Sequence, residues 1–330
     1  MTGPSRGRRR PSVLVLAVAL AAAAVACSGG GKGTTGATKG ASGDLAVEVA
    51  SFDLAVGPPS RFIVGVLTPD HRVVGFGTVA MRFSFLGAGK AGSPQPVGAP
   101  MAATFLAIPG STVPSPAPAE PRLATGDERG VYSVRQGFDR DGFWQVEVSA
   151  RVEGRERRGT GAFSVADHHA VPAPGDAALA TENLTLSSTD APKAAVDSRA
   201  GTDGEVPDPE LHRTTIAAAL RARRPAVVVF ATPVYCTSRF CGPVTDLVDD
   251  LAKTYGDRAS FVHVEIWREF QNTVLNKAAA DWLFRNGDLN EPWVFVIGSD
   301  GRITARFDNV VTRDELEPLV ARLPVIGPAT

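Results

Sequence analysis

The sequence has few cysteines, little net charge and no long hydrophobic run, and each absence limits what the protein can be. The formal net charge of its 330 residues is −1, so the chain as a whole gives no electrostatic reason to expect nucleic acid or acidic substrates as partners. Its longest uninterrupted apolar run, residues 13–26, is too short for a comfortable transmembrane helix. Only three cysteines are present, so any disulfide chemistry concerns very few residues.

The N-terminus has the pattern of an export signal. Arginines cluster in residues 6–10, and the apolar run that follows has the length of the central part of a signal peptide. Residues 24–27 (Ala-Val-Ala-Cys) end this pattern, and small residues before a cysteine resemble the bacterial lipoprotein signal, in which the cysteine is diacylated. The resemblance implies a signal peptide over 1–27, lipidation at Cys27 and a position at the extracytoplasmic face of the cell membrane. Ala24 stands where leucine is usual, and an ordinary secretory signal with an incidental cysteine is the alternative.

A tether and then a β-rich region follow. Residues 28–43 are rich in Gly, Ser, Thr and Ala and predict a flexible tether. From 44 to 166, short segments of alternating polarity follow one another without a useful helical stretch, which is typical of a sandwich of two antiparallel sheets. The segment 141–148, Asp-Gly-Phe-Trp-Gln-Val-Glu-Val, resembles a late strand of an immunoglobulin-like domain, which implies an all-β immunoglobulin-like sandwich over 44–166. No cysteine pair staples this region, and it shows no catalytic constellation.

The composition changes twice in the second half. Residues 167–207 are rich in Ala, Pro, Asp, Ser and Thr and predict a linker, part of which can lie along a domain. At Asp208 the order Asp-Pro-Glu is typical of a helix start, and helices and strands then alternate. The expected helices cover 208–221, 243–255, 272–284 and a segment from 312, and the expected strands cover 226–230, 261–266, 293–297 and 303–307.

Two of the cysteines lie at a junction between these elements. Cys236 and Cys241 come after the strand 226–230, which is apolar enough to be buried on both faces, and before the helix 243–255. At such a corner, unpaired N–H groups and the positive end of the helix dipole favour a thiolate. Arg239, between the two cysteines, adds to this effect. An exported protein works in an oxidising compartment, so the pair can form a disulfide.

The order of elements and the position of the cysteines resemble the thioredoxin fold. Tyr235 and Cys236 match the aromatic-Cys dipeptide of that family, and Pro292 stands directly before a strand, where the family has its cis-proline. The resemblance covers about residues 208–325 and implies an α/β thioredoxin-like domain there, in addition to the β-sandwich. It also implies that Tyr235, Pro292 and Trp293 line a substrate groove beside the cysteines.

Three departures from the family pattern bear on the chemistry. Four residues separate the cysteines where the family has two, and Glu291 precedes the proline where a small or β-branched residue is usual. Cys241 is followed by Gly-Pro-Val, so it also matches the first cysteine of the family's Cys-Gly-Pro-Cys box. The nucleophile is therefore either Cys236, resolved by Cys241, or Cys241, partnered by Cys236, and the Tyr-Cys dipeptide favours the first arrangement.

The pair predicts thiol–disulfide exchange with protein thiols or disulfides of the cell envelope, because exchange needs an attacking thiolate and a second thiol that releases the mixed disulfide. A copper-handling protein is one alternative, since soft thiolates bind Cu(I) and His263 is the nearest candidate for a third ligand. A binding module with a fixed structural disulfide is the other. His263 can equally be a core or edge histidine, and Glu265 is either a buried carboxylate that tunes proton transfer or a solvated edge residue. No metal site, no cofactor and no nucleic-acid partner is assigned.

Overall fold

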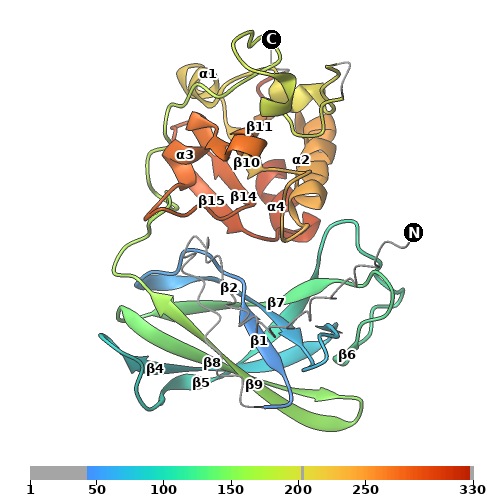
Figure 1. Ribbon diagram of the computed structural model, residues 1–330, viewed down its shortest axis with the longest axis vertical. Helices are drawn as coiled ribbons and strands as arrows, with labels where there is room; N and C mark the ends of the chain where they lie inside the picture. Colours follow the sequence, from blue (N-terminus) through green and yellow to red (C-terminus); the bar gives the residue numbers. More distant parts are fainter. Residues whose placement is uncertain (1–42, 202–203, 328–330) are drawn as a thin grey trace, which may run out of the picture. The chain divides into compact units, whose positions relative to one another are not determined.

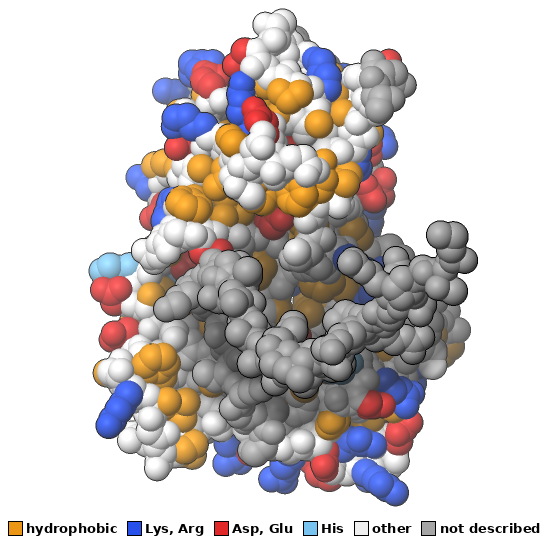
Figure 2. Space-filling view, viewed as in Figure 1, with side chains coloured by type: hydrophobic (Ala, Val, Ile, Leu, Met, Phe, Trp, Pro, Cys, Tyr) orange, Lys and Arg blue, Asp and Glu red, His pale blue; other side chains and the backbone are white. Residues whose placement is uncertain are grey.

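The computed structural model describes residues 43–201 and 204–327. The predicted signal peptide (1–27), the predicted lipidation site Cys27 and nearly all of the predicted tether lie outside these residues. Across the described ranges, no helix combines the length and the apolar character needed to cross a membrane. On the described part of the face in Figure 2, positive and negative side chains are interspersed, in keeping with the small net charge.

The first half folds around one antiparallel sheet of seven strands in the order β1-β2-β7-β5-β4-β8-β9 (Figure 1). The N–H of Leu45, directly before the first strand, donates to the carbonyl of Arg158 in the last at 3.0 Å. The sheet therefore curls until its two ends meet, and it is nearly closed. Its strands are β1 (Ala46–Val49), β2 (Gly57–Leu67), β4 (Thr78–Gly87), β5 (Gln95–Ala107), β7 (Gly130–Phe138), β8 (Gly142–Val152) and β9 (Arg155–Val165), and β3 (Val74–Gly75) pairs separately with β6 (Arg122–Leu123).

Alternating polarity produces this sheet because each strand buries one face. In β8, the side chains of Trp144, Val146 and Val148 are fully buried, whereas the residues between them are partly exposed. The inward side chains meet aromatic rings from β2 and β4, where Phe62 and Phe83 pack edge to face with their ring centres 5.0 Å apart. The core of this half is therefore the inside of the curled sheet.

The predicted immunoglobulin-like sandwich is wrong, because all seven strands belong to one nearly closed, barrel-like sheet. A sandwich and a barrel both bury one face of every strand, so alternation along the sequence is the same in both. Pairings between strands that are distant in sequence decide the outcome. Here β7 pairs with both β2 and β5, and β4 pairs with both β5 and β8, which joins all the strands edge to edge.

The second half contains a four-stranded mixed sheet in the order β11-β10-β14-β15 (Figure 1). β10 (Ala226–Ala231) runs parallel to β11 (Ser260–Glu265), whereas β14 (Trp293–Ile297) pairs antiparallel with both β10 and β15 (Ile303–Asp308). Every residue of β10 and β11 is buried, as the apolar run at 226–230 predicts. The other elements are α1 (Ile216–Arg221), α2 (Cys241–Tyr255), α3 (Lys277–Leu283), α4 (Arg313–Ala321), β12 (Trp267–Glu269), η3 (Phe270–Asn272) and β13 (Val274–Leu275).

Two of the expected helices are shorter in the structure. The first, expected over 208–221, is divided into a 3-10 turn, η2 (Pro209–His212), and α1. The third, expected over 272–284, begins only at Lys277, because the chain before it forms a hairpin of β12 and β13. With 38% of the described residues in strands and 17% in helices, the structure is mostly β, so the predicted fold class, a sandwich joined to an α/β thioredoxin-like domain, is overturned. A short pattern of apolar residues does not distinguish a helix from turns and short strands, because these also bury one side.

The last helix begins where its capping residues predict. Thr312 accepts a hydrogen bond from the N–H of Glu315 at 3.3 Å, and the Glu315 carboxylate accepts one from the N–H of Thr312 at 3.1 Å. The helix continues through Pro318, which lies inside it. Leu316 and Val320 form its buried face.

The segment 167–207, predicted as a linker, contains a 3-10 turn, η1 (Lys193–Ala195), and no long helix or strand in its described part. Asp197, directly after this turn region, is nevertheless fully buried. The N–H of Ser198 donates to the carboxylate of Glu265 at 2.8 Å, so this part of the segment lies against β11.

Truncation of Phe83 to alanine should lower the free energy of unfolding by about 3–5 kcal/mol, because its ring is 1% exposed and leaves a cavity inside the curled sheet. Phe143→Ala is the matched control. Its ring is 38% exposed in the same sheet, and its removal should cost about 0.5 kcal/mol or less. Urea unfolding measures both, and equal losses would contradict the placement of Phe83 in the core.

Candidate functional site

The two cysteines predicted to act together are joined in the structure. Cys236 and Cys241 form a disulfide with their Cα atoms 6.1 Å apart, within the reach that bridging requires. Cys236 lies in the loop after β10 and is partly exposed, whereas Cys241 is the first residue of α2 and is fully buried. A thiolate from solvent therefore meets the sulfur of Cys236 and not that of Cys241.

The start of α2 shapes the electrostatics around the disulfide. This helix has 15 residues, and no side chain caps its N-terminus. The first-turn N–H groups and the positive end of the dipole therefore remain available to stabilise a thiolate at Cys241. The hydroxyl of Ser238 lies 3.2 Å from the sulfur of Cys236, close enough to donate to a thiolate there as well.

An apolar surface next to Cys236 comes from the hairpin of β12 and β13, which is not predicted from the sequence. The rings of Tyr235 and Phe270 stack with centres 3.9 Å apart, and Trp267 packs edge to face on the same phenylalanine. Val234, Phe270 and Val274 all expose a third or more of their surface. The helix expected over 272–284 overlaps this hairpin, so the hairpin was not predicted. The aromatic residues Trp267 and Phe270 are the feature of the sequence that could have indicated it.

The residues predicted to bind substrate differ in their exposure. Tyr235 is partly exposed beside the disulfide. The Glu291–Pro292 bond is cis, as expected at this position, and Pro292 is buried. Trp293 is 2% exposed, and its ring packs between those of Phe52 and Phe295. Of the predicted set, Tyr235 is therefore the side chain that a visiting chain can contact directly.

Glu291, noted in the sequence only as a departure, lies at the disulfide. One of its carboxylate oxygens is within 4.8 Å of the sulfurs of both Cys236 and Cys241. Its Oε2 atom is buried and has no hydrogen-bond partner. Burial raises the pKa of Glu291 to about 8, and the nearby charge of Glu265 adds to the effect. This carboxyl group therefore holds a proton near neutral pH beside the two sulfurs.

Glu265 lies deeper in the same region and is 1% exposed, which excludes the solvated edge position. Its carboxylate accepts hydrogen bonds from the N–H of Ser198 at 2.8 Å and from that of Trp267 at 3.2 Å. Burial raises the pKa of Glu265, against the opposing effects of the charge on His263 and of hydrogen bonds from Thr232 and Ser198. A second buried carboxylate thus sits near Glu291.

His263 is a core histidine, because its side chain is fully buried and its Nε2 atom lies 3.0 Å from the carbonyl of Ala231. Within the described ranges, it groups with Asp197 and His212, whereas the cysteine pair groups with Glu291. The arrangement of cysteines and histidine that the copper-handling alternative needs is therefore not assembled in this structure.

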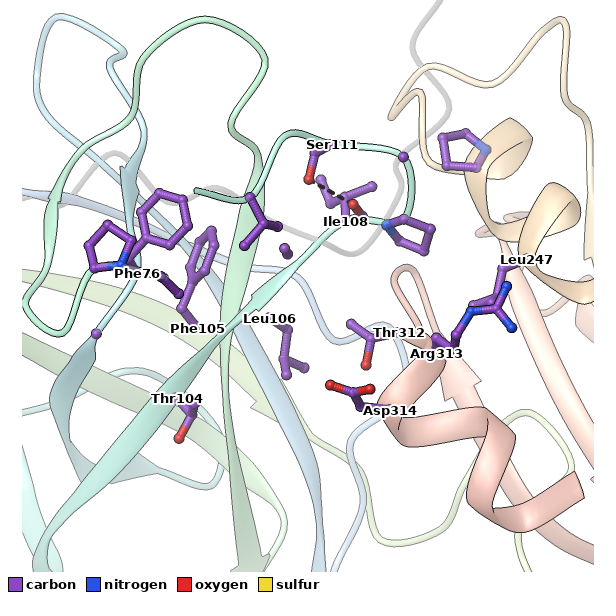
Figure 3. Close-up of a pocket in the computed structure, with 18 of the residues that line it drawn as sticks. Phe76, Thr104, Phe105, Leu106, Ile108, Ser111, Leu247, Thr312, Arg313 and Asp314 are labelled. Carbon is purple, nitrogen blue, oxygen red and sulfur yellow. Dashed lines mark hydrogen bonds between the residues drawn. The ribbon is translucent and has the colours of Figure 1, made fainter. Parts of the chain in front are cut away.

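A pocket of about 900 Å³ lies elsewhere in the protein (Figure 3). It is lined by parts of β4, β5 and the loop that follows, by the first two thirds of α2 and by the start of α4. Thr312, which caps α4, and Arg313 and Asp314 in its first turn contribute polar side chains, and Ser111 donates to the carbonyl of Ile108 at 2.7 Å. No cysteine or histidine lines it, so we place the candidate site at the disulfide.

Comparison with protein-family models and with curated proteins finds no match for this chain. The function is therefore argued from the geometry of the site alone.

Replacement of Glu291 by glutamine should make the protein more stable at pH 8 than at pH 5, relative to wild type. The folded pKa of Glu291 is raised from 4.5 to about 8, so the carboxyl group destabilises the folded state increasingly as the pH rises between these values. The gain at the upper end should be about 1–3 kcal/mol, since one pKa unit is worth about 1.4 kcal/mol and partial exposure reduces the full effect.

Urea unfolding at several pH values measures this difference, with Glu48→Gln on the exposed side of β1 as the control. A stability difference between Glu291→Gln and wild type that does not change with pH would show that Glu291 ionises normally in the folded protein.

Proposed function

We propose that the protein exchanges disulfides with protein thiols of the cell envelope through Cys236 and Cys241, and that a lipid on Cys27 anchors it at the extracytoplasmic face of the membrane. The observation that carries the proposal is a disulfide at the start of α2 with one accessible sulfur and one buried sulfur. Such asymmetry separates the sulfur that is attacked from the one that leaves.

The exchange proceeds in two displacements. A substrate thiolate attacks the sulfur of Cys236, the bond to Cys241 breaks, and Cys241 leaves as a thiolate at the N-terminus of α2. A second thiolate of the substrate then attacks the substrate sulfur of the mixed disulfide, and Cys236 leaves as a thiolate. The substrate dithiol is oxidised to a disulfide, the protein pair is reduced, and a different protein disulfide returns the pair to its oxidised form.

Glu291 supports the proton balance of these steps. Its protonated carboxyl group lies within 4.8 Å of both sulfurs and can donate to the thiolate that leaves.

The exposed apolar side chains Val234, Phe270 and Val274 offer a surface for the residues that flank a substrate cysteine. These contacts suit an unfolded or extended segment, whose apolar side chains are exposed.

A non-catalytic module with a structural disulfide is the second candidate. It is favoured by the complete burial of Cys241, which ties the loop after β10 to α2. The two candidates differ in whether the bond opens under mild reducing conditions, because structural disulfides resist the glutathione pool.

The test compares two single-cysteine variants of the purified full chain, each mixed with a peptide that carries an accessible disulfide. Cys241→Ser should form a mixed disulfide at Cys236, visible by intact mass spectrometry. Cys236→Ser should react about tenfold or more slowly, because its remaining thiol is buried.

The wild-type bond should also open in millimolar glutathione. Exchange is ruled out if the bond stays closed there and neither variant forms a mixed disulfide, which is the result that the structural alternative predicts.

A further inference from the structure

Three fully buried side chains that play no part in the proposed exchange meet beside the four-stranded sheet. Asp197 comes from the segment after η1, His212 is the last residue of η2, and His263 lies in the middle of β11. One ligand atom from each lies within 4.8 Å of the other two. Asp197 lies in the segment 167–207 that is predicted as a linker, and His212 lies in the expected helix 208–221.

The distances inside this cluster are those of ligands around a common ion. Nε2 of His212 and Nδ1 of His263 each lie 3.3 Å from Oδ2 of Asp197. Neither ring nitrogen makes a hydrogen bond in the structure. Ligands at about 2.0–2.1 Å from a tetrahedral zinc ion are separated by about 3.3 Å.

The hydrogen bond at Nε2 of His263 determines whether Nδ1, which lies against the carboxylate of Asp197, carries a hydrogen. Nε2 of this ring lies 3.0 Å from the carbonyl oxygen of Ala231, and a carbonyl only accepts, so Nε2 carries the hydrogen. In the neutral ring, Nδ1 then presents a lone pair to Asp197, which is itself an acceptor. Two acceptors that face each other at 3.3 Å in a fully buried place require a positive charge between them.

The surrounding charges favour a divalent ion over a single proton. Arg199 donates to both carboxylate oxygens of Asp197, at 2.8 and 3.1 Å, and also to Asp208 at 2.7 Å and Asp246 at 3.1 Å. With neutral imidazole rings, one guanidinium faces three carboxylates, of which Asp197 and Asp208 are little exposed and Asp246 is exposed, so negative charge is in excess around the cluster. Arg199 also orients the Asp197 carboxylate, as outer partners of metal ligands do.

We propose that Asp197, His212 and His263 bind one divalent transition-metal ion, with zinc as the best match. Two imidazole nitrogens and one carboxylate oxygen are a ligand set that zinc takes readily, whereas magnesium and calcium prefer oxygen ligands alone. Because the three side chains are fully buried, the ion is structural and fastens the segment after η1, and η2, to β11. A second cluster among the described residues, Cys236, Cys241 and Glu291, lacks free thiolate ligands while the disulfide is closed.

The test uses the full chain, purified without chelator and kept oxidised so that the cysteines cannot bind metal. Elemental mass spectrometry should find about one zinc per chain, and His212→Asn should lower zinc affinity by about tenfold or more. His71→Asn is the matched control, because His71 is exposed in a turn at a φ of 63° that asparagine tolerates, and this variant should keep its zinc.

A second measurement does not depend on whether the variant folds. Wild-type protein unfolded with chelator and refolded with Co²⁺ should develop the visible absorption bands of tetrahedral cobalt, and refolding with zinc should give a higher melting temperature than refolding with chelator. Folded wild-type protein that contains no metal, gives no cobalt bands and melts at the same temperature with zinc or chelator overturns the proposal. Equal zinc content in wild type and in folded His212→Asn overturns it as well.

Discussion

The burial of ionisable side chains near the cysteine pair is the constraint on which the second half of the protein depends. Glu265 and His263 lie in β11 with 1% and 0% of their surface exposed, in a strand whose other side chains, apart from Ser260, are apolar. A buried charge without partners is strongly destabilising, so other parts of the chain must supply hydrogen bonds or opposite charges. Asp197 and the N–H of Ser198 do this from a segment that has no apolar pattern of its own.

This requirement explains why a polar, proline-containing segment is ordered beside the sheet. The side-chain amide of Asn276 donates to the carbonyl of Ala195 at 2.8 Å and to that of Glu265 at 2.7 Å, which ties η1 to β11. Such contacts join residues far apart in sequence. Composition therefore predicted a linker, whereas hydrogen bonding to buried groups decides where the segment after η1 lies.

The same buried groups separate the two chemistries that the structure suggests. Glu291 faces the disulfide, and its raised pKa keeps a proton near the sulfurs. His263 lies against Asp197 and, among the described residues, groups with Asp197 and His212 and not with the cysteines. Exchange at the surface and the organisation of the interior are thus assigned to different side chains, although Glu265 lies close to both.

Local signals in the sequence determined the strand 226–230, the cysteine pair at a helix start, the cis bond before Pro292 and the capping box at Thr312, because each depends on neighbours in the chain. Tertiary structure decided the rest. Alternating polarity shows that a strand buries one face, but only the pairing of distant strands makes a barrel-like sheet in place of a sandwich. The positions of Glu291 at the sulfurs and of Asp197 between two histidines likewise follow from long-range packing, which no local pattern of residues encodes.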